Sequence, residues 1–165
     1  REVDFNRVVD SVARMVLDRT TKAGLSLEIS CDTDLAEVLA DERMVRQMLL
    51  NLLSNAAKFT PEQGTISVQS MRNDAGETIL RVSDTGVGIA EENFEKILMP
   101  FGQVENALSR STSGTGLGLS LVKSMIELHG GEIRIESVPD EGTSFSLVFP
   151  ASRSAASRAD GQAAE

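Results

Sequence analysis

The sequence lacks the features that would place it in an oxidising compartment or in a membrane. Cys31 is its one cysteine, so no disulfide can form within the chain, and this favours the reducing cytosol. No apolar run approaches the roughly 18 residues that a membrane-spanning helix needs, and no signal peptide is evident. We expect a cytoplasmic domain without membrane contact. Because the chain opens at Arg1 without a methionine, we also expect a longer parent protein, which is free to be membrane-anchored.

The chain has fewer basic than acidic residues. The chain has 16 Lys and Arg residues against 25 Asp and Glu residues, a formal net charge of −9. This balance argues against non-specific binding to nucleic acid or to an acidic membrane surface, both of which need a basic surface. Its 165 residues suit one compact domain, and 41% hydrophobic with 25% charged residues is ordinary for a globular protein.

Hydrophobic periodicity predicts helices over 5–23, 42–59 and 115–129, and a short one near 91–98. Asp4 and Asp41 are placed to cap the first two, and Gly130-Gly131 to end the third. Alternating patterns predict strands at 25–30, 36–40, 65–71, 78–84, 132–137 and 143–149. The polar segment 99–113 is expected to be a mobile loop, and 151–165 a disordered tail after a domain over 1–150. The predicted fold is an α/β (α+β) two-layer sandwich, with a mixed sheet of about five strands and three main helices on one face.

The stretch "RSTSGTGLGL" at 110–119 carries three glycines before a helical run. Glycines allow close approach of a backbone, and a helix start offers N–H groups to an anion. The last glycine is not directly followed by a lysine and a Ser or Thr, so this is not a P-loop, and the spacing differs from the dinucleotide fingerprint. The stretch indicates phosphate binding only weakly by itself.

Asn51, Asn55 and Lys58 share one face of the predicted helix 42–59, beside its apolar stripe. Asparagine is a mediocre helix former, so two of them in mid-helix need a reason. They are either solvated surface groups or a ligand face, in which an amide oxygen would serve as a hard ligand for Mg²⁺ and Lys58 as a cation for phosphate. Taken alone, the pattern favours the surface interpretation.

The motif "SDTGVGI" at 83–89 places Asp84 where a strand ends and a glycine turn begins. Asp-x-Gly is ordinary turn chemistry. The functional alternative is that the carboxylate accepts a hydrogen bond from a base amino group, with Gly86 and Gly88 letting the chain pass close by. A buried contact of this kind would discriminate strongly for adenine.

Phe94 and Phe101, in "ENFEKILMPFGQ" at 92–103, are two of only six phenylalanines. We expect them to anchor a loop that otherwise lacks a core. Gln103, Arg110 and Ser111 lie in the same loop and are within its reach of a phosphate, but the sequence does not choose among them.

Four motifs in a fixed order make the pattern specific. "NLLSNAAKFT", "DTGVGI", "FEKILMPF" and "GTGLGL" resemble the N, G1, F and G2 boxes of the ATP-binding catalytic domain of sensor histidine kinases. That domain belongs to the GHKL (Bergerat-fold) superfamily, with gyrase, the ninety-kilodalton heat-shock chaperones and mismatch-repair ATPases. "ELHGGEIRIES" followed by "EGTSFSLVFP" resembles the closing helix–strand–strand segment, so the likeness covers about residues 1–150.

The resemblance implies a role for each motif. Asn55 would coordinate Mg²⁺ bridging the ATP phosphates, Asn51 and Lys58 would hold those phosphates, and Asp84 would bind the adenine amino group. The remaining cofactor-binding residues that it implies are Gly86, Gly88, Phe94, Phe101, Gln103, Arg110, Gly114, Thr115, Gly116, Leu117 and Gly118. The phenylalanines would anchor a lid over ATP, and the last glycines would let it hinge.

Two departures narrow the implied function. Where hydrolytic relatives carry a glutamate that activates water, this chain has Asn51, and an amide cannot be that base. Its one histidine, His129, closes a predicted helix and is expected to be structural. The resemblance therefore implies donation of the γ-phosphoryl group to a histidine on a separate dimeric helical phosphoacceptor domain of the parent, with a response regulator receiver domain downstream. The alternatives are a GHKL-type ATPase and a degenerate scaffold domain.

Overall fold

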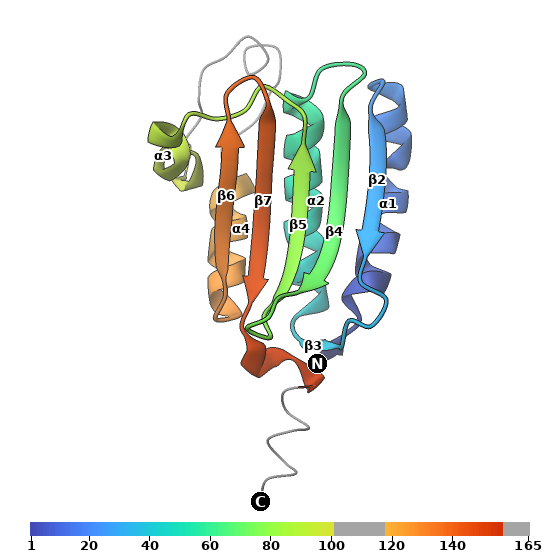
Figure 1. Ribbon diagram of the computed structural model, residues 1–165, viewed down its shortest axis with the longest axis vertical. Coiled ribbons are helices and arrows are strands. Elements are labelled where there is room, and N and C mark those ends of the chain that lie inside the picture. Colours follow the sequence, from blue (N-terminus) through green and yellow to red (C-terminus); the bar gives the residue numbers. More distant parts are fainter. Residues whose placement is uncertain (101–117, 157–165) are drawn as a thin grey trace, which may run out of the picture.

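The computed structural model describes residues 1–100 and 118–156. Figure 1 shows two layers, a sheet in front and helices behind it. The main sheet has five strands: β2 (Ser26–Cys31), β4 (Thr65–Arg72), β5 (Thr78–Asp84), β6 (Glu132–Val138) and β7 (Gly142–Phe149). Three long helices cover one of its faces: α1 (Phe5–Lys22), α2 (Glu42–Phe59) and α4 (Gly118–Leu128). The predicted two-layer sandwich with a mixed sheet is confirmed.

The strands follow the order β2-β4-β5-β7-β6. β2 runs parallel to β4, and every other neighbouring pair is antiparallel. In the chain, β2 and β4 are connected through α2, which crosses behind the sheet. The pairs β4–β5 and β6–β7 are hairpins. In consequence the C-terminal end of β5, the start of β4 and the β6–β7 turn meet at one edge, the upper edge in Figure 1.

The core lies between the sheet and the helices. Along β4, Ile66 and Val68 point inward and are fully buried. The residues that follow each of them, Ser67 and Gln69, remain partly exposed. On α2 the inward stripe repeats with the helical period and is fully buried at Val45, Met48, Leu49, Leu52, Leu53 and Ala56. This apolar stripe leaves the adjacent helix face, with its asparagines, free for other contacts.

Both predicted helix caps are present. The Asp4 side chain accepts the Arg7 N–H at 3.2 Å, and Asp41 accepts from Arg43 N–H at 2.9 Å and Met44 N–H at 3.2 Å. Gly130 ends the last long helix with a positive φ of 72°. None of the helices in the described part of the chain has both the length and the apolar character that crossing a bilayer requires.

A second, two-stranded sheet lies at the lower end of the molecule in Figure 1. It pairs β1 (Glu2–Val3) with β3 (Val38–Leu39), and Ser154 forms a β-bridge to Val38. The sequence predicts a disordered tail from residue 151, and for the described part of that tail the prediction is wrong. Ala151–Arg153 form a 3-10 helix and Ser154 is buried, because the chain after β7 pairs with β3 and Ala155 N–H bonds the Glu37 carbonyl.

Candidate nucleotide-binding site

Asp84 is the last residue of β5 and lies at the upper edge of the sheet in Figure 1. Its carboxylate accepts the Gly86 N–H at 2.9 Å. Burial raises the pKa of this carboxyl above its ordinary value, and the backbone N–H groups of Gly86 and Thr143 offset part of the rise. A partly buried acceptor with only backbone partners can take a hydrogen bond from a donor that enters the site.

The glycines of the loop 85–89 are required by the protein's own backbone. A Cβ on Gly86 would lie 2.3 Å from the Phe59 carbonyl oxygen at the end of α2. A Cβ on Gly88, whose φ is +70°, would lie 2.1 Å from the Val138 carbonyl oxygen. The sequence predicts that these glycines line a ligand, but the contacts observed are with α2 and β6.

α2 brings Asn55 and Lys58 to the same end of the molecule, because Phe59 at its C-terminus supports the glycine loop. Both side chains are half-buried. Within residues 1–100 and 118–156, neither the Asn55 amide nor the Lys58 ammonium has a hydrogen-bond or ion-pair partner. In the same ranges no group of three His, Cys, Asp or Glu side chains could hold a metal ion. The helix face thus offers an amide oxygen and a cation that have no partner among the residues the structure describes.

Asn51, one turn earlier on α2, is engaged by the protein itself. Its oxygen accepts from the Gln47 amide at 2.8 Å, and its amide nitrogen donates to the Gly118 carbonyl at 3.3 Å. It therefore joins α2 to the first residue of α4. A Cβ on Gly118 would meet no atom within 4 Å among those described, so packing in the described structure does not require glycine there.

The predicted lid is described only in part. Phe94 begins α3 (Phe94–Leu98) and is half-buried. The residue that anchors α3 in the core is Ile97, 5% exposed, which the sequence interpretation missed although it follows Phe94 at the i+3 spacing typical of a helix face. The other predicted lid residues lie outside the described residues: Phe101, Gln103, Arg110, Gly114, Thr115, Gly116 and Leu117.

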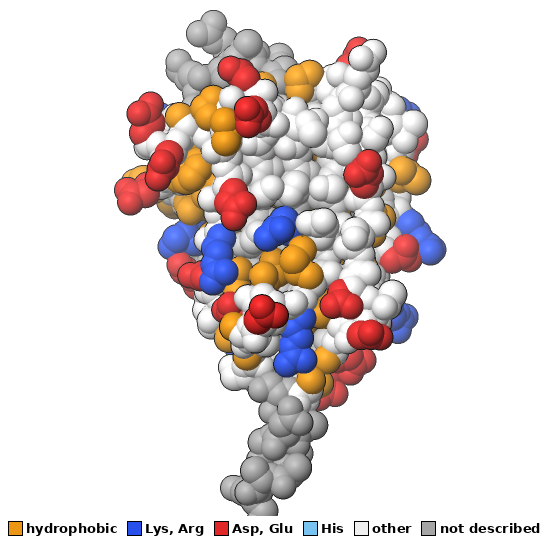
Figure 2. All heavy atoms as spheres, viewed as in Figure 1, with side chains coloured by type: hydrophobic (Ala, Val, Ile, Leu, Met, Phe, Trp, Pro, Cys, Tyr) orange, Lys and Arg blue, Asp and Glu red, His pale blue; other side chains and the backbone are white. Residues whose placement is uncertain are grey.

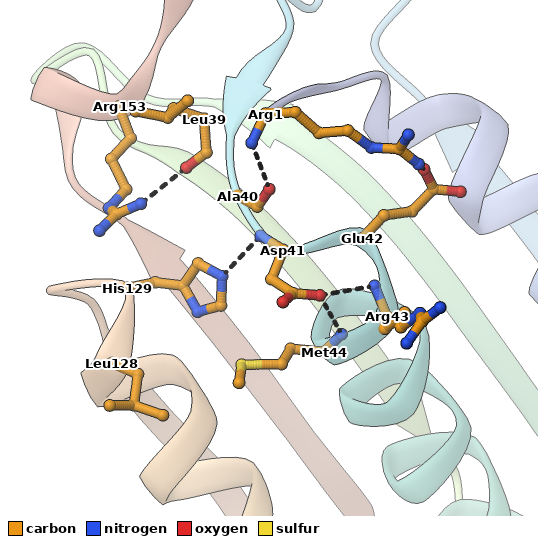
Figure 3. A pocket seen from close by; sticks show the side chains of 10 residues that line it. All are labelled: Arg1, Leu39, Ala40, Asp41, Glu42, Arg43, Met44, Leu128, His129 and Arg153. Atoms are coloured by element: carbon orange, nitrogen blue, oxygen red, sulfur yellow. Dashed lines mark hydrogen bonds and ion pairs between the residues drawn. The ribbon is translucent and has the colours of Figure 1, made fainter.

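His129 has the structural role predicted for it. It is 4% exposed, and its Nδ1 bonds the Met125 carbonyl at 2.7 Å, within the last turn of α4. Its Nε2 accepts the Asp41 N–H at 3.1 Å, which fixes the neutral tautomer with the proton on Nδ1. The ring therefore ties the end of α4 to the N-cap of α2 (Figure 3).

The hollow around this histidine is a poor candidate for the nucleotide site. It measures about 690 Å³ and is lined by Arg1, Asp41, Glu42 and Arg153 among others. Arg1 pairs with Glu42, and Arg153 donates to the Leu39 carbonyl at 2.9 Å, so much of its charge is already partnered (Figure 3). It lies beside β3, at the end of the molecule opposite Asp84.

The sheet face that the helices leave open is also a poor candidate. Figure 2 shows few charged side chains over the upper part of its centre, and charged side chains of both signs farther down. Its polar groups bond one another across strands, as Ser83 Oγ does with Ser144 Oγ at 2.7 Å and Arg81 with Ser146 Oγ at 3.0 Å. The end of the sheet at Asp84 is therefore the better candidate for a polar ligand.

Known proteins share this arrangement. Residues 40–153 match the family model described as histidine kinase-, DNA gyrase B- and HSP90-like ATPase. The chain is 46% identical over 146 residues to the non-motile and phage-resistance protein of Caulobacter vibrioides, covering 87% of this chain and 17% of that protein. The chain thus spans about a sixth of the length of this relative.

Two solved structures extend the likeness to the whole fold. The catalytic domain of the histidine kinase ThkA, in a nucleotide-free form, superposes with a TM-score of 0.78 at 30% identity, covering 92% of this chain and 97% of that one. Full-length ShkA in complex with AMPPNP gives 0.80 at 31% identity, covering 91% and 30%. The matching family model and these solved structures define a GHKL-type ATP-binding domain. The chain belongs to the histidine kinase-, DNA gyrase B- and HSP90-like ATPase family, as an ATP-binding domain of the sensor histidine kinase type.

Proposed function

We propose that the domain binds Mg-ATP between α2 and the loop 85–89 and donates the γ-phosphoryl group to a histidine outside this chain. The carrying observation is that three polar groups able to meet a ligand lie at one end of the fold. Asp84 is a partly buried acceptor that has only backbone partners, and Asn55 and Lys58 lack partners among the described residues. The adenine amino group would donate a hydrogen bond to the Asp84 carboxylate, and the phosphates would extend along α2 to Lys58.

The donor set fits a magnesium ion that depends on the nucleotide. Asn55 offers one neutral oxygen, and the described residues hold no carboxylate cluster that could bind the ion alone. Mg²⁺ is commonly held by one or two protein groups together with phosphates and water. When bound, the ion would neutralise charge that develops on the transferring phosphoryl group. Asn55 would orient it, and Lys58 would add a second positive charge.

The position of Asn51 favours transfer over hydrolysis. An amide cannot take a proton from water, and here both ends of the amide are held by Gln47 and Gly118. His129 cannot be the acceptor in this fold, because it is buried and both ring nitrogens are bonded. It is the only histidine of the chain. The γ-phosphoryl group would therefore pass from ATP to an imidazole nitrogen on a dimeric helical phosphoacceptor domain, with ADP as the leaving group, and from there to a response regulator receiver domain.

Calorimetric titration with ADP and ATP, with and without Mg²⁺, tests the binding step. The wild-type protein should bind both nucleotides, and Mg²⁺ should tighten ATP. Asn55→Ala should lose the Mg²⁺ effect and keep its fold, because Asn55 lies off the buried stripe. Ser54→Ala is the matched control on the neighbouring position, where the side chain contacts Arg19 instead. An Asn55→Ala protein with the full Mg²⁺ effect contradicts the metal role.

Label transfer from γ-labelled ATP tests the chemistry. The chain alone should acquire no phosphohistidine and release phosphate slowly. Adding the parent's phosphoacceptor domain should place label on that domain, weakly, because a separated pair loses the roughly millimolar effective concentration that a tether gives. Fast phosphate release would favour the ATPase alternative. ATP binding with no label on the added domain would favour the scaffold alternative.

A further inference from the structure

Ser137, in β6, is the centre of a hydrogen-bond cluster beside the candidate site. Its Oγ accepts the Ile89 N–H at 2.7 Å and donates to the Gly142 carbonyl at 2.9 Å. The Thr143 hydroxyl lies 2.8 Å from the same atom. With Thr143 as donor, the single Ser137 oxygen makes three bonds and all three groups are satisfied. This serine thus joins the loop 85–89 to both strands of the β6–β7 hairpin.

The loop 85–89 is held from three sides. Thr85 exchanges hydrogen bonds with Thr65 at the start of β4, through its N–H at 3.1 Å and its Oγ1 at 2.9 Å. Val87 N–H bonds the Phe59 carbonyl at 3.2 Å, which ties the loop to α2. The third side is the β6–β7 hairpin, where the Ser137 hydroxyl is the side-chain anchor. The far end of the loop therefore depends on this one hydroxyl and on backbone contacts.

The β6–β7 hairpin also packs closely against Asp84. Thr143 pairs with Asp84 across β5 and β7, and a Cβ on Gly142 would lie 2.0 Å from the Asp84 carbonyl oxygen. The Thr143 side chain is 6% exposed, so it has little room to rotate. Asp84 is thus fixed between Gly86 on the loop and Thr143 on the hairpin, and Ser137 bonds both of these segments.

We propose that Ser137 is a positioning residue for base recognition, which holds the loop 85–89 against the β6–β7 hairpin so that the Asp84 carboxylate faces the adenine. This inference rests on the proposed function. Ser137 does not touch the base in this proposal; it acts through Asp84. Removing its hydroxyl frees the Ile89 end of the loop and relaxes the site on the side of the hairpin, so nucleotide affinity falls before the fold does.

The chain offers a matched control. Ser144 lies on β7 one residue after Thr143, and its hydroxyl bonds Ser83 across the strands on the open face of the sheet. Ser144→Ala removes one hydroxyl contact of the same hairpin, on the open face of the sheet, without touching the loop. Ser137→Thr keeps the hydroxyl and serves as the conservative rescue.

The experiment measures ADP affinity by calorimetry and the exchange rate of the Ile89 amide by NMR. Ser137→Ala should weaken ADP about two- to tenfold, the effect of one lost hydrogen bond, and should speed Ile89 exchange. Ser144→Ala should change neither, and Ser137→Thr should restore both. In an Asp84→Asn background, Ser137→Ala should have no further effect on affinity, because the group it positions is gone.

The outcomes separate this inference from the proposed function. A wild-type protein that binds no adenine nucleotide overturns the proposed function, and the inference with it. Wild-type binding with equal ADP affinity in wild type and Ser137→Ala overturns the inference alone, as does an additive effect in the Asp84→Asn background. If Ser137→Ala does not fold, the wild-type protein decides, because an Ile89 amide that exchanges as fast as an exposed one contradicts the anchor.

Discussion

The two ends of the molecule treat their polar groups in opposite ways. At the lower end in Figure 1, His129 bonds through both ring nitrogens, Asp41 caps α2, and Arg153 holds a backbone carbonyl. At the upper end, Asp84 is buried at a cost that raises its pKa, and Asn55 lacks a partner among the residues described. The groups named at the lower end bond within the protein, whereas those at the upper end are the ones that we propose bind a ligand.

The difference shows how the fold divides stability from function. Sites that bind ligands commonly carry groups that destabilise the empty protein, and the rest of the structure compensates. Here the stabilising contacts include the hydrogen bonds by which His129 connects α4 to α2. They lie at the end of the molecule opposite Asp84. Substitutions at the two ends should therefore affect different measurements, and each prediction below compares them.

Asp84→Asn should have the largest effect on binding. The asparagine keeps an oxygen for Gly86 N–H but presents amide donors where adenine presents its own, so ADP affinity should fall by about 1–3 kcal/mol, roughly 10- to 100-fold. The free energy of unfolding at neutral pH should not fall, because no charge is buried any more. Calorimetric titration and denaturant unfolding measure the two quantities. Asp10→Asn, at an exposed position of α1, is the control. An unchanged ADP affinity in Asp84→Asn refutes the adenine contact.

His129→Ala should produce the reverse pattern. It leaves the Asp41 N–H without its acceptor and removes a ring packed 5.5 Å from that of Phe149, centroid to centroid. The free energy of unfolding should fall by about 2 kcal/mol, while ADP affinity stays within twofold when measured well below the melting temperature. Leu128→Ala, at a side chain 68% exposed, should change neither. A large loss of affinity in a folded His129→Ala protein would break the division between the two ends.

The pH dependence of unfolding should isolate the cost of burying Asp84. Because burial raises the pKa of this carboxyl, the folded protein binds its proton at pH values where the unfolded chain has released it. This group alone therefore makes the folded state more stable as the pH falls through the raised pKa toward the ordinary one. The difference in unfolding free energy between Asp84→Asn and wild type should be greatest at neutral pH and shrink on acidification. A difference that is constant with pH would contradict the buried carboxylate.

Ser154→Ala should have the smallest effect on the free energy of unfolding. It should raise this free energy, whereas most substitutions of buried residues lower it. The Ser154 Oγ is buried and is the one such side-chain atom without a partner among the described residues. Replacing it with a methyl group removes an unsatisfied polar atom, so the free energy of unfolding should rise by about 0–1 kcal/mol. Thermal unfolding beside Ser152→Ala, on the same short segment, measures it. A clear loss of stability would show that the hydroxyl has a partner.

Much of the fold could be predicted from local sequence signals. Asp4, Asp41 and Gly130 mark helix ends that agree with the structure, since caps depend on residues close in sequence. The parallel pairing of β2 with β4 and the pairing of Ser154 with Val38 join distant segments, and no local pattern encodes them. The described part of the predicted tail, residues 151–156, differs from the expectation for this reason, because it gains order from a remote strand.

The candidate site divides in the same manner. Asn51 and Asn55 stand out because asparagine is uncommon in mid-helix, and Asp84 because it comes where a strand ends and a glycine turn begins. Their roles, and that of Lys58, are implied only by the order of the four motifs. Ser137 could not be found, since a serine in an alternating strand is ordinary and its role lies in the Ile89 N–H, 48 residues away in sequence. Gly86 and Gly88 were identified, but their contacts with backbone carbonyls of α2 and β6 appear only in three dimensions.

Amide hydrogen exchange with and without ADP and Mg²⁺ tests the central claim most directly. The account predicts that nucleotide slows exchange in residues 84–89 and in the C-terminal half of α2. It predicts no change at the opposite end, in residues 38–44, 126–131 and 151–155. Protection at the opposite end, with residues 84–89 unchanged, would contradict the account, because it would place the nucleotide in the hollow beside His129.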